Sequence, residues 1–502
     1  MKKRFLKYLS ASLALLMLLA AFAACGKKDS GEIGDTGGND APDVSDSESE
    51  TKPSSAIGAT GLEIRDYGGR SMQIWYTKSG VWAPQPLFVG EDTLSTGDIV
   101  AKAGYTRNKL MEETYKVYMD YTVSDADHSG TGTNSAVTEL RTMYKSGDTA
   151  KYDVIFASSR ACGWLSQEGF FYDIAESDYI NPDAYYYESQ VNEQVKLFGK
   201  QYFASGYYST QNTAAMSVMF VNLGIIESIT QGSVTEDTLY QKALDHTWTM
   251  EYMLNLGKAY ATPTQNTGDN LKDRYAFTLP ASYDFPLFYD MGGSLLEYDE
   301  NTGKYVCTVE DHQNLLTYLE DSLEKNPNVG LISGDAGTPE AFKASTSPFM
   351  YGSFYTLTRI MDSSIAWTTM PSPLYAEGDQ YRSYSASYNL NFSGIPANCR
   401  DIDKATYLYE VFMAHSYDHV YPAYYEECFG TRYQPTSTSA QVFDMISASR
   451  VVCIADIYRL FEGTPISHMI GRTTSTGWPH DVGSGVKVLT DTINASMAEL
   501  GW

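Results

Sequence analysis

The sequence has little positive charge. Its 502 residues include 36 lysines and arginines against 62 aspartates and glutamates, which gives a formal net charge of −26 at pH 7. Such an excess of negative charge repels phosphate backbones instead of neutralising them. The composition therefore argues against nucleic acid as a partner.

Cysteine is also scarce, with six residues and no spacing typical of a metal site. Besides Cys25, the chain holds Cys162, Cys307, Cys399, Cys428 and Cys453. This odd number leaves at least one thiol free or paired between molecules, and no disulfide pairing can be deduced from the sequence. We expect the cysteines of the folded part to be buried and inert.

Familiar catalytic and metal-binding motifs are missing. There is no G-x-S-x-G, Walker A or G-x-G-x-x-G segment. His415 and His419 have a spacing that could hold zinc on a helix, but the residues between them lack the glutamate of H-E-x-x-H. We expect no metal, no cofactor and no enzymatic activity. The alternative is a glycosidase, since the 62 acidic residues offer many candidates for its pair of catalytic carboxylates.

The N-terminal apolar run is too short to span a membrane. Ala11 to Ala24 has fourteen residues, against about 20 for a membrane-spanning helix, and follows four basic residues at positions 2, 3, 4 and 7. This pattern predicts a secretory signal peptide over residues 1–24.

The run ends Phe22-Ala23-Ala24-Cys25, which resembles a bacterial lipobox with Phe22 in place of the usual Leu. The resemblance implies that Cys25 carries a diacylglycerol, with palmitate-type acyl chains anchoring the protein at the extracytoplasmic face of the cell membrane. An ordinary signal peptide with an incidental cysteine is the alternative.

Aromatic residues are absent from the segment that follows. Residues 26–60 contain eight acidic and three basic residues, a composition that cannot support a packed core. We interpret residues 25–60 as the lipidated cysteine and an acidic tether. Without the four positive charges of residues 1–24 and the net −5 of residues 26–60, residues 61–502 carry −25.

The remainder of the chain is rich in tyrosine, with 40 residues, and alternates between expected strands and helices. Strands are predicted at Ser71–Tyr76, Tyr115–Val123, Tyr152–Ala157 and Ser217–Asn222, with helices from Asn108 and over Ala136–Lys145. Asp299–Gly303 is predicted to be a hairpin turn. An EF-hand calcium loop has glycine at its sixth position, whereas here the glycine is the fifth residue of the segment, which argues against a calcium site. Thr249 and Thr308 are expected helix N-caps. The alternation predicts an α/β fold with parallel sheets covered by helices.

Six segments follow one another along the chain: Tyr152–Phe156 with Leu165–Phe170, Lys200–Tyr202 with Met219–Asn222, Thr247–Thr249, Pro286-Leu287 with Gly292-Gly293, Phe342 with Met350 and Gly352, and Met370–Pro373. Their order resembles the extracellular solute-binding proteins of ABC importers, the maltose-binding-like family. The resemblance covers residues 61 to about 415, and the last ninety residues match only loosely.

This resemblance implies a two-lobe, type II periplasmic-binding-protein-like fold with a hinge and a ligand cleft between the lobes. Lobe 1 would comprise residues 61–210 and 372–412, and lobe 2 residues 211–371 and 413–502, with crossings near 206–215, 368–375 and 412. The implied function is capture of a small solute for the permease subunits of an ABC importer by a monomeric receptor. A surface glycan-processing enzyme, or an adhesion lipoprotein without an importer, remains open.

Candidate ligand-binding residues follow from strand ends. In open α/β sheets, ligands bind beyond the carboxyl ends of strands, which nominates Thr77, Lys78, Ser158, Ser159, Arg160, Tyr283 and Asp284. The resemblance adds Phe354 as a stacking aromatic two residues after Gly352, and Trp82, Tyr207 and Phe285 lie near the predicted cleft edges. The tyrosine-rich composition favours a carbohydrate ligand, while the negative field keeps a cationic ligand as the alternative.

Overall fold

The computed structural model describes residues 59–79, 90–95, 98–128, 133–281, 283–333, 337–425, 437–460 and 482–502. The expected signal peptide, Cys25 and the tether up to residue 58 lie outside these residues, as do Trp82 and Cys428. None of the helices in the described ranges combines the length and the apolar character that crossing a membrane requires.

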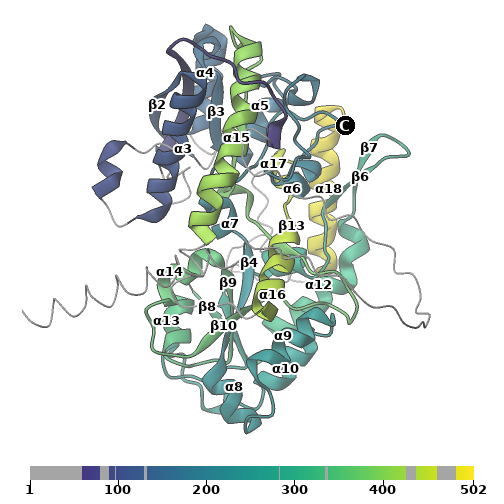
Figure 1. Ribbon diagram of the computed structural model, residues 1–502. Coiled ribbons are helices and arrows are strands. Elements are labelled where there is room, and N and C mark those ends of the chain that lie inside the picture. The colour runs from purple at the N-terminus through teal and green to yellow at the C-terminus, as the bar shows by residue number, and fades with distance from the viewer. Residues whose placement is uncertain are drawn as a thin grey trace, which may run out of the picture. The chain divides into compact units, whose positions relative to one another are not determined.

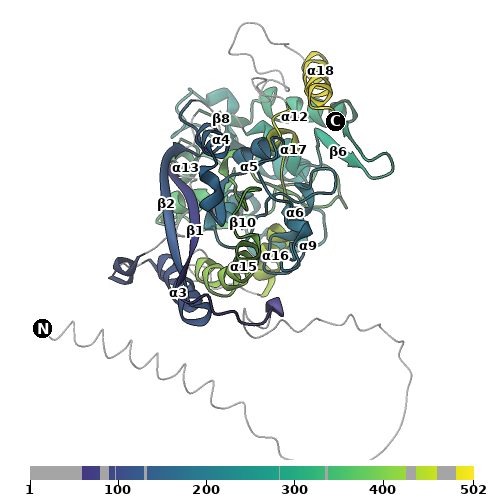
Figure 2. The ribbon, with the colours of Figure 1, turned by 90° about the horizontal axis from the view of Figure 1, so that it is seen from above.

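The first sheet has four strands in the order β12 (Asn391–Gly394), β3 (Val154–Ser158), β1 (Arg70–Ser79) and β2 (Val117–Asp127). β1 is parallel to β2 and β3, whereas β12 is antiparallel to β3. Figure 2 shows β1 and β2 side by side. Every residue of β3 is buried, as expected of a strand with helices on both faces. The strands expected at 71–76 and 152–157 are confirmed; the one expected from Tyr115 begins at Val117, because Tyr115 still belongs to helix α3 (Ile99–Tyr115).

The second sheet has five strands in the order β10 (Trp367–Met370), β4 (Ser217–Asn222), β9 (Phe349–Ser353), β5 (Phe277–Pro280) and β8 (Val329–Ile332). β5 is parallel to β8 and β9, and β4 is antiparallel to β9 and β10. β4 coincides with the expected strand and is buried along its whole length. Both sheets are therefore mixed and not purely parallel, while the α/β class is confirmed (Figure 1).

Helices pack on both sheets. α4 (Ala136–Ser146), α5 (Ser159–Ser166) and α3 pack with the first sheet, and α8 (Leu223–Thr230), α9 (Glu236–Leu244) and α13 (Gly337–Lys343) pack with the second. α10 (Met250–Gly257) begins after the expected cap, since Thr249 Oγ1 accepts a hydrogen bond from the Tyr252 amide at 3.1 Å. The cap expected at Thr308 is wrong: a 3-10 turn over Val309–His312 precedes α12 (Gln313–Leu319), and the Thr308 hydroxyl is buried without a hydrogen bond.

Two small sheets complete the strands of the described residues. β6 (Leu296–Asp299) and β7 (Lys304–Cys307) form the expected antiparallel hairpin around Asp299–Gly303. β11 (Ser383–Tyr384) pairs in parallel with β13 (Arg450–Val451). The second pair joins segments that are far apart in the sequence.

The chain passes from the first sheet to the second between β3 and β4, through α6 (Ser189–Gln194) and α7 (Thr210–Ala214), and returns between β10 and β12. Residue 412, an expected crossing, falls inside the continuous helix α15 (Ile402–Tyr425). There the Phe412 ring packs 5.8 Å from Phe156 of β3, so the chain remains beside the first sheet at this residue.

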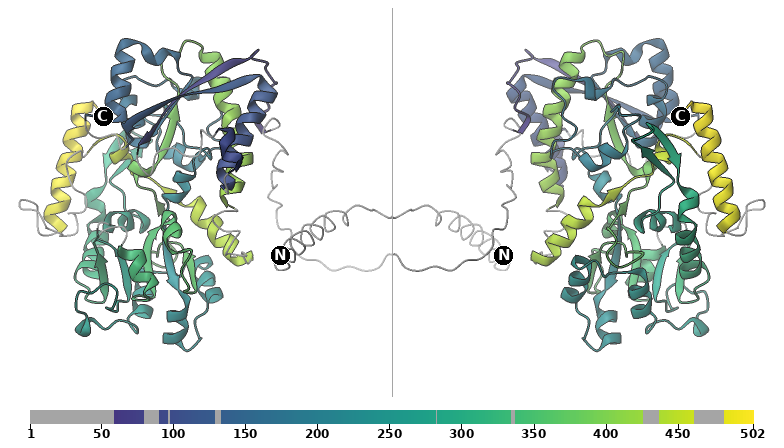
Figure 3. Two further views of the ribbon diagram at one scale, coloured as in Figure 1. Left: turned by 90° about the vertical axis from the view of Figure 1, so that its left-hand side faces the viewer. Right: turned by 90° about the vertical axis from the view of Figure 1, so that its right-hand side faces the viewer.

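The C-terminal helices pack against different parts of the molecule. α16 (Ser437–Ala448) packs on α9, α17 (Ile454–Ile457) on α5, and α18 (Val482–Leu500) on α12. Figure 3 shows α18, in yellow, on the side of the described chain away from α3. The described residues beyond Asp403 are mostly helical.

Candidate functional site

The segment from Ser383 to Asn391 joins the carboxyl edges of the two sheets. At the second sheet, the Ser383 hydroxyl donates to the Ser217 carbonyl oxygen at 2.8 Å, and Ser217 pairs with Ser353 at the end of β9. At the first sheet, Asn391 pairs with Ser158, the last residue of β3. The strand ends that ligands favour in α/β proteins therefore meet along this one segment.

A cavity of about 260 Å³ lies along this segment. We call it the Tyr384 cavity, and it is lined by Ala215, Ser217, Tyr283, Phe285, Pro286, Gly352, Ser353, Tyr384, Ala386, Tyr388 and Asn389. Four of these residues are aromatic, three others are serines or an asparagine that offer hydroxyl or amide groups, and none of the described lining residues is charged. A smaller cavity of about 120 Å³ shares Tyr283, Gly352 and Ser353 with it and extends toward Thr338 and Arg359.

A buried carboxylate holds one wall of the Tyr384 cavity in place. Asp290, at the end of α11 (Asp284–Asp290), accepts hydrogen bonds from the Ser217 hydroxyl at 2.8 Å and the Tyr384 amide at 2.6 Å. The hydroxyls of Tyr351 and Ser372 donate to the same carboxylate, each at 2.6 Å. Burial raises the pKa of Asp290 to about 6. Because four donors converge on it, Asp290 ties α11 to β4, β9 and β11.

Sequence reasoning missed Asp290 and the whole 383–391 segment. The signal for Asp290 was present, since an aspartate ends the otherwise apolar run Phe285–Tyr289. A charged residue in such a run is buried only when polar partners surround it. The 383–391 segment has no regular hydrophobic pattern from which its place between the two sheets could have been predicted.

The predicted residues Ser158, Ser159 and Arg160 lie behind the segment and not in the cavity lining. The Ser158 hydroxyl accepts from the Ala161 amide at 3.2 Å and caps α5, and the Ser159 hydroxyl donates to the Ser387 carbonyl oxygen at 2.6 Å. Arg160 forms a two-pronged ion pair with Asp456 at 2.8–3.1 Å. Its guanidinium lies 5.4 Å from the centre of the Tyr388 ring. These residues position Ser387 and Tyr388.

The predicted residues at the end of β1 do not line any of the cavities described here. Thr77 is fully buried and its hydroxyl donates to the Ala126 carbonyl oxygen. Lys78 is exposed and forms an ion pair with Asp125 at 3.1 Å. Trp82, the third candidate in this part of the sequence, lies outside the described residues.

Tyr283, which precedes α11, and Phe285, within α11, both line the Tyr384 cavity. Asp284 is the first residue of α11. Phe354 is only 2% exposed, and its ring packs 5.4 Å from the Phe443 ring at an interplanar angle of 61°. In this structure Phe354 is a packing residue, while its neighbours Gly352 and Ser353 line the cavity.

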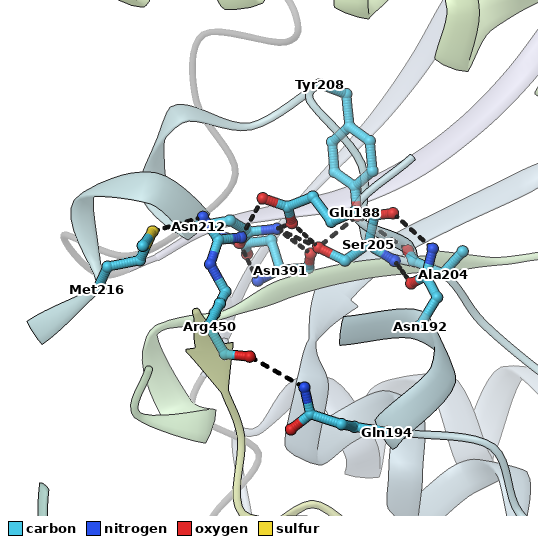
Figure 4. A network of polar contacts seen from close by, with 10 residues as sticks. All are labelled: Glu188, Asn192, Gln194, Ala204, Ser205, Tyr208, Asn212, Met216, Asn391 and Arg450. Atoms are coloured by element: carbon cyan, nitrogen blue, oxygen red, sulfur yellow. Dashed lines mark hydrogen bonds and ion pairs between the residues drawn. The ribbon is translucent and has the colours of Figure 1, made fainter. Parts of the chain in front are cut away.

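Tyr207 lies in a different cavity of about 270 Å³, which we call the Glu188 cavity. It is lined by Tyr185, Tyr187, Glu188, Ser189, Gln190, Val191, Tyr207, Thr213, Tyr421, Asp444, Ser447, Ala448 and Arg450. Glu188 and Arg450 form an ion pair in which both side chains are about 95% buried. Figure 4 shows this pair within a network that includes Ser205, Asn212 and Asn391.

Histidines and cysteines do not gather into a metal site in the described residues. His415 and His419 stack with ring centres 6.1 Å apart, and burial lowers the pKa of His415 to about 4. No group of three or more His, Cys, Asp or Glu suited to a metal ion occurs in the described part of the chain.

Cys162 and Cys453 are buried free thiols, and Cys307 and Cys399 are half-buried free thiols. Burial raises the pKa of Cys453 to about 12, so its thiol stays protonated and unreactive near neutral pH.

Comparison with known proteins adds no family assignment, since no protein-family model and no curated protein matches the sequence.

Proposed function

We propose that this protein is a surface-anchored substrate-binding lipoprotein that captures a small uncharged carbohydrate and delivers it to an ABC importer. The observation that carries the proposal is the Tyr384 cavity, whose described lining combines aromatic rings with hydroxyl and amide groups and includes no charged residue. Its position where the carboxyl edges of two sheets meet is the position expected of a ligand site. The order of the six sequence segments supports the same function.

A carbohydrate fits the chemistry of this lining. Sugar rings present apolar C–H faces, which pack on aromatic side chains, and hydroxyls, which pair with Ser217, Ser353 and Asn389. A charged ligand would be desolvated in this cavity without an opposite charge beside it, which costs free energy. The volume of about 260 Å³ is slightly below the ~300–1,000 Å³ typical of ligand sites, which favours a small solute.

In this proposal the two sheets form the cores of two lobes that move about the connecting segments 206–215 and 368–375. The ligand would favour the closed arrangement because it contacts both sides only there. Lipid attachment at Cys25 would hold the receptor beside the importer, and the acidic tether would let the folded part move above the membrane surface.

Binding of mono- and oligosaccharides, followed by thermal shift and tryptophan fluorescence, tests the ligand class. Tyr388 is 40% exposed and lines the cavity, so Tyr388→Ala should weaken binding of the cognate sugar by about 5- to 100-fold without unfolding the protein. Tyr375→Ala is the matched control, because Tyr375 is 39% exposed and lies outside the lining. Binding of peptides or amines but no sugar, or equal affinity of the Tyr388→Ala variant, would contradict the assignment.

Uptake of the labelled sugar by cells tests the importer role separately. A strain that lacks the protein should lose high-affinity uptake, and wild-type protein but not Tyr388→Ala should restore it. Uptake that is unchanged in the deletion strain would favour an adhesion lipoprotein, and release of smaller sugars from a glycan by the purified protein would favour a hydrolase.

A further inference from the structure

We propose that the Glu188 cavity binds an organic cation of the quaternary ammonium class, at a site separate from the Tyr384 cavity. This second site does not depend on the carbohydrate-receptor function. The argument rests on the charges, the rings and the fixed wall of the cavity.

The charges of the cavity leave one negative charge unbalanced. Glu188 and Arg450 neutralise each other through their buried ion pair. Asp444 is exposed in the cavity lining, and no hydrogen bond or ion pair to its carboxylate is present within the described residues. The described lining residues therefore carry a net charge of −1, which matches a monovalent cation. The −25 carried by residues 61–502 attracts cations to the molecule as a whole.

Tyrosine rings form a corner of the same cavity. The rings of Tyr207 and Tyr421 lie 4.5 Å apart at an angle of 57°, and both line the cavity. Tyr417 supports them from behind, 5.0 Å from Tyr207 and 5.5 Å from Tyr421. Tyr185, a third lining ring, lies 5.2 Å from Tyr417. Aromatic faces attract organic cations, and rings set at an angle to one another in a cavity that also has a carboxylate in its lining are suited to a quaternary ammonium group.

A hydrogen-bond network fixes another part of the lining. The Glu188 carboxylate accepts hydrogen bonds from the Ser205 hydroxyl, the Asn212 amide at 3.3 Å and Arg450, as Figure 4 shows. Asn212 also donates to the Asn391 carbonyl oxygen at 3.0 Å. Because Arg450 is already held by Glu188 and by the Met216 sulfur, it is not available as the main partner of an anionic ligand. A wall that is fixed before binding lowers the ordering cost of binding.

The two cavities thus differ in the ligand they favour. Among the described residues, the Tyr384 cavity is lined by aromatic rings and no charged group, whereas the Glu188 cavity is lined by aromatic rings and one unbalanced carboxylate. A sugar hydroxyl can donate a hydrogen bond to that carboxylate, but only a cation also neutralises its charge, and a quaternary ammonium group gains from the ring faces as well.

Calorimetric titration of the full chain with choline tests the proposal, with the uncharged isostere 3,3-dimethyl-1-butanol as the comparison ligand. We expect saturable choline binding that weakens as salt is added, and at least tenfold weaker binding of the isostere. Asp444→Asn should weaken choline binding about fivefold, and Tyr421→Leu should weaken it by roughly 2- to 30-fold. Tyr388→Ala, in the other cavity, should leave choline affinity unchanged.

Three results would overturn the proposal: no saturable choline binding at millimolar concentration, equal affinity for choline and its isostere, or unchanged affinity in the Asp444→Asn variant. Asp444 is exposed, so Asp444→Asn remains informative even where Tyr421→Leu does not fold. The sugar assignment is tested independently, because sugar binding should respond to Tyr388→Ala and not to Asp444→Asn.

Discussion

At the scale of single residues, buried carboxylates decide how stability responds to pH. Glu410, on α15, is 1% exposed and accepts hydrogen bonds from the hydroxyls of Tyr186 and Tyr187 at 2.5 and 2.6 Å. Burial raises its pKa from an ordinary value of 4.5 to about 7, although the tyrosine hydrogen bonds oppose the change. The folded protein therefore keeps a proton that the unfolded chain releases.

The sign of the resulting pH dependence follows from this difference in proton binding. Between pH 4.5 and about 7 the folded state binds more protons than the unfolded state, so the contribution of Glu410 to the free energy of unfolding falls as pH rises. The loss should be on the order of 3 kcal/mol. Glu410→Gln should remove it, so that wild type loses stability relative to the variant over this range.

Urea unfolding of both proteins across that pH range measures the difference. Asp362→Asn, at an exposed position, serves as the control and should follow the wild-type curve. A constant difference between wild type and Glu410→Gln at every pH would contradict the prediction.

At the scale of elements, close helix contacts depend on glycine. A Cβ atom added at Gly163 of α5 would lie 2.2 Å from the Ile457 carbonyl oxygen of α17. Backbone atoms cannot move aside as a flexible side chain does, so Gly163→Ala should force α5 and α17 apart and cost about 1–3 kcal/mol of unfolding free energy. Thermal and urea unfolding measure this cost.

Gly224→Ala is the matched control for this prediction. Gly224 is exposed in α8, and its added Cβ would find no atom closer than 3.5 Å. Because alanine restricts the unfolded chain more than glycine does, this substitution should stabilise the protein by about 0.4–1 kcal/mol. Equal effects of the two substitutions would show that the α5–α17 contact can relax.

The Glu188–Arg450 pair connects elements that are distant in sequence, since Glu188 precedes α6 and Arg450 lies in β13. Arg450→Met should cost about 3–5 kcal/mol, because it leaves the Glu188 carboxylate buried without its counter-charge. Adding Glu188→Gln removes that stranded charge. The double variant should therefore lose less stability than the sum of the two single variants in a double-mutant cycle, and additive losses would argue against direct coupling.

The elements that the sequence predicted best are those with strong local signals. β4 was found from its apolar, β-branched run, and α10 from its Thr249 cap, since neither depends on distant residues. The helix N-cap predicted at Thr308 was wrong because a 3-10 turn, and not the α-helix, follows this residue. Arg160 was predicted to contact the ligand, but its ion-pair partner Asp456 lies 296 residues away and could not be identified from the sequence. Tyr384 and Tyr388 were missed because long-range pairing, and not local pattern, brings their segment to the sheet edges.

At the scale of the whole molecule, the proposed lipid anchor makes a prediction about where the protein is found. Labelling of cells with an alkynyl fatty acid should mark the wild-type protein in the membrane fraction, and Cys25→Ala should be unlabelled and absent from that fraction. Sugar affinity should be equal in both proteins, because residues 26–60 separate the anchor from the folded part. Unlabelled wild-type protein in the medium would rule out the anchor.

The proposed hinge predicts a change in dimensions on binding. The segment Ser383–Asn391 is bonded to both sheets and carries Tyr384 and Tyr388, so a ligand held there would contact residues attached to each sheet. Such a ligand favours the arrangement in which both sets of contacts form at once. Small-angle scattering should therefore show a smaller radius of gyration with the cognate sugar than without it. Tyr388→Ala at the same sugar concentration should keep the larger value, and a wild-type radius that is unchanged at saturation would refute hinge closure while leaving sugar binding itself intact.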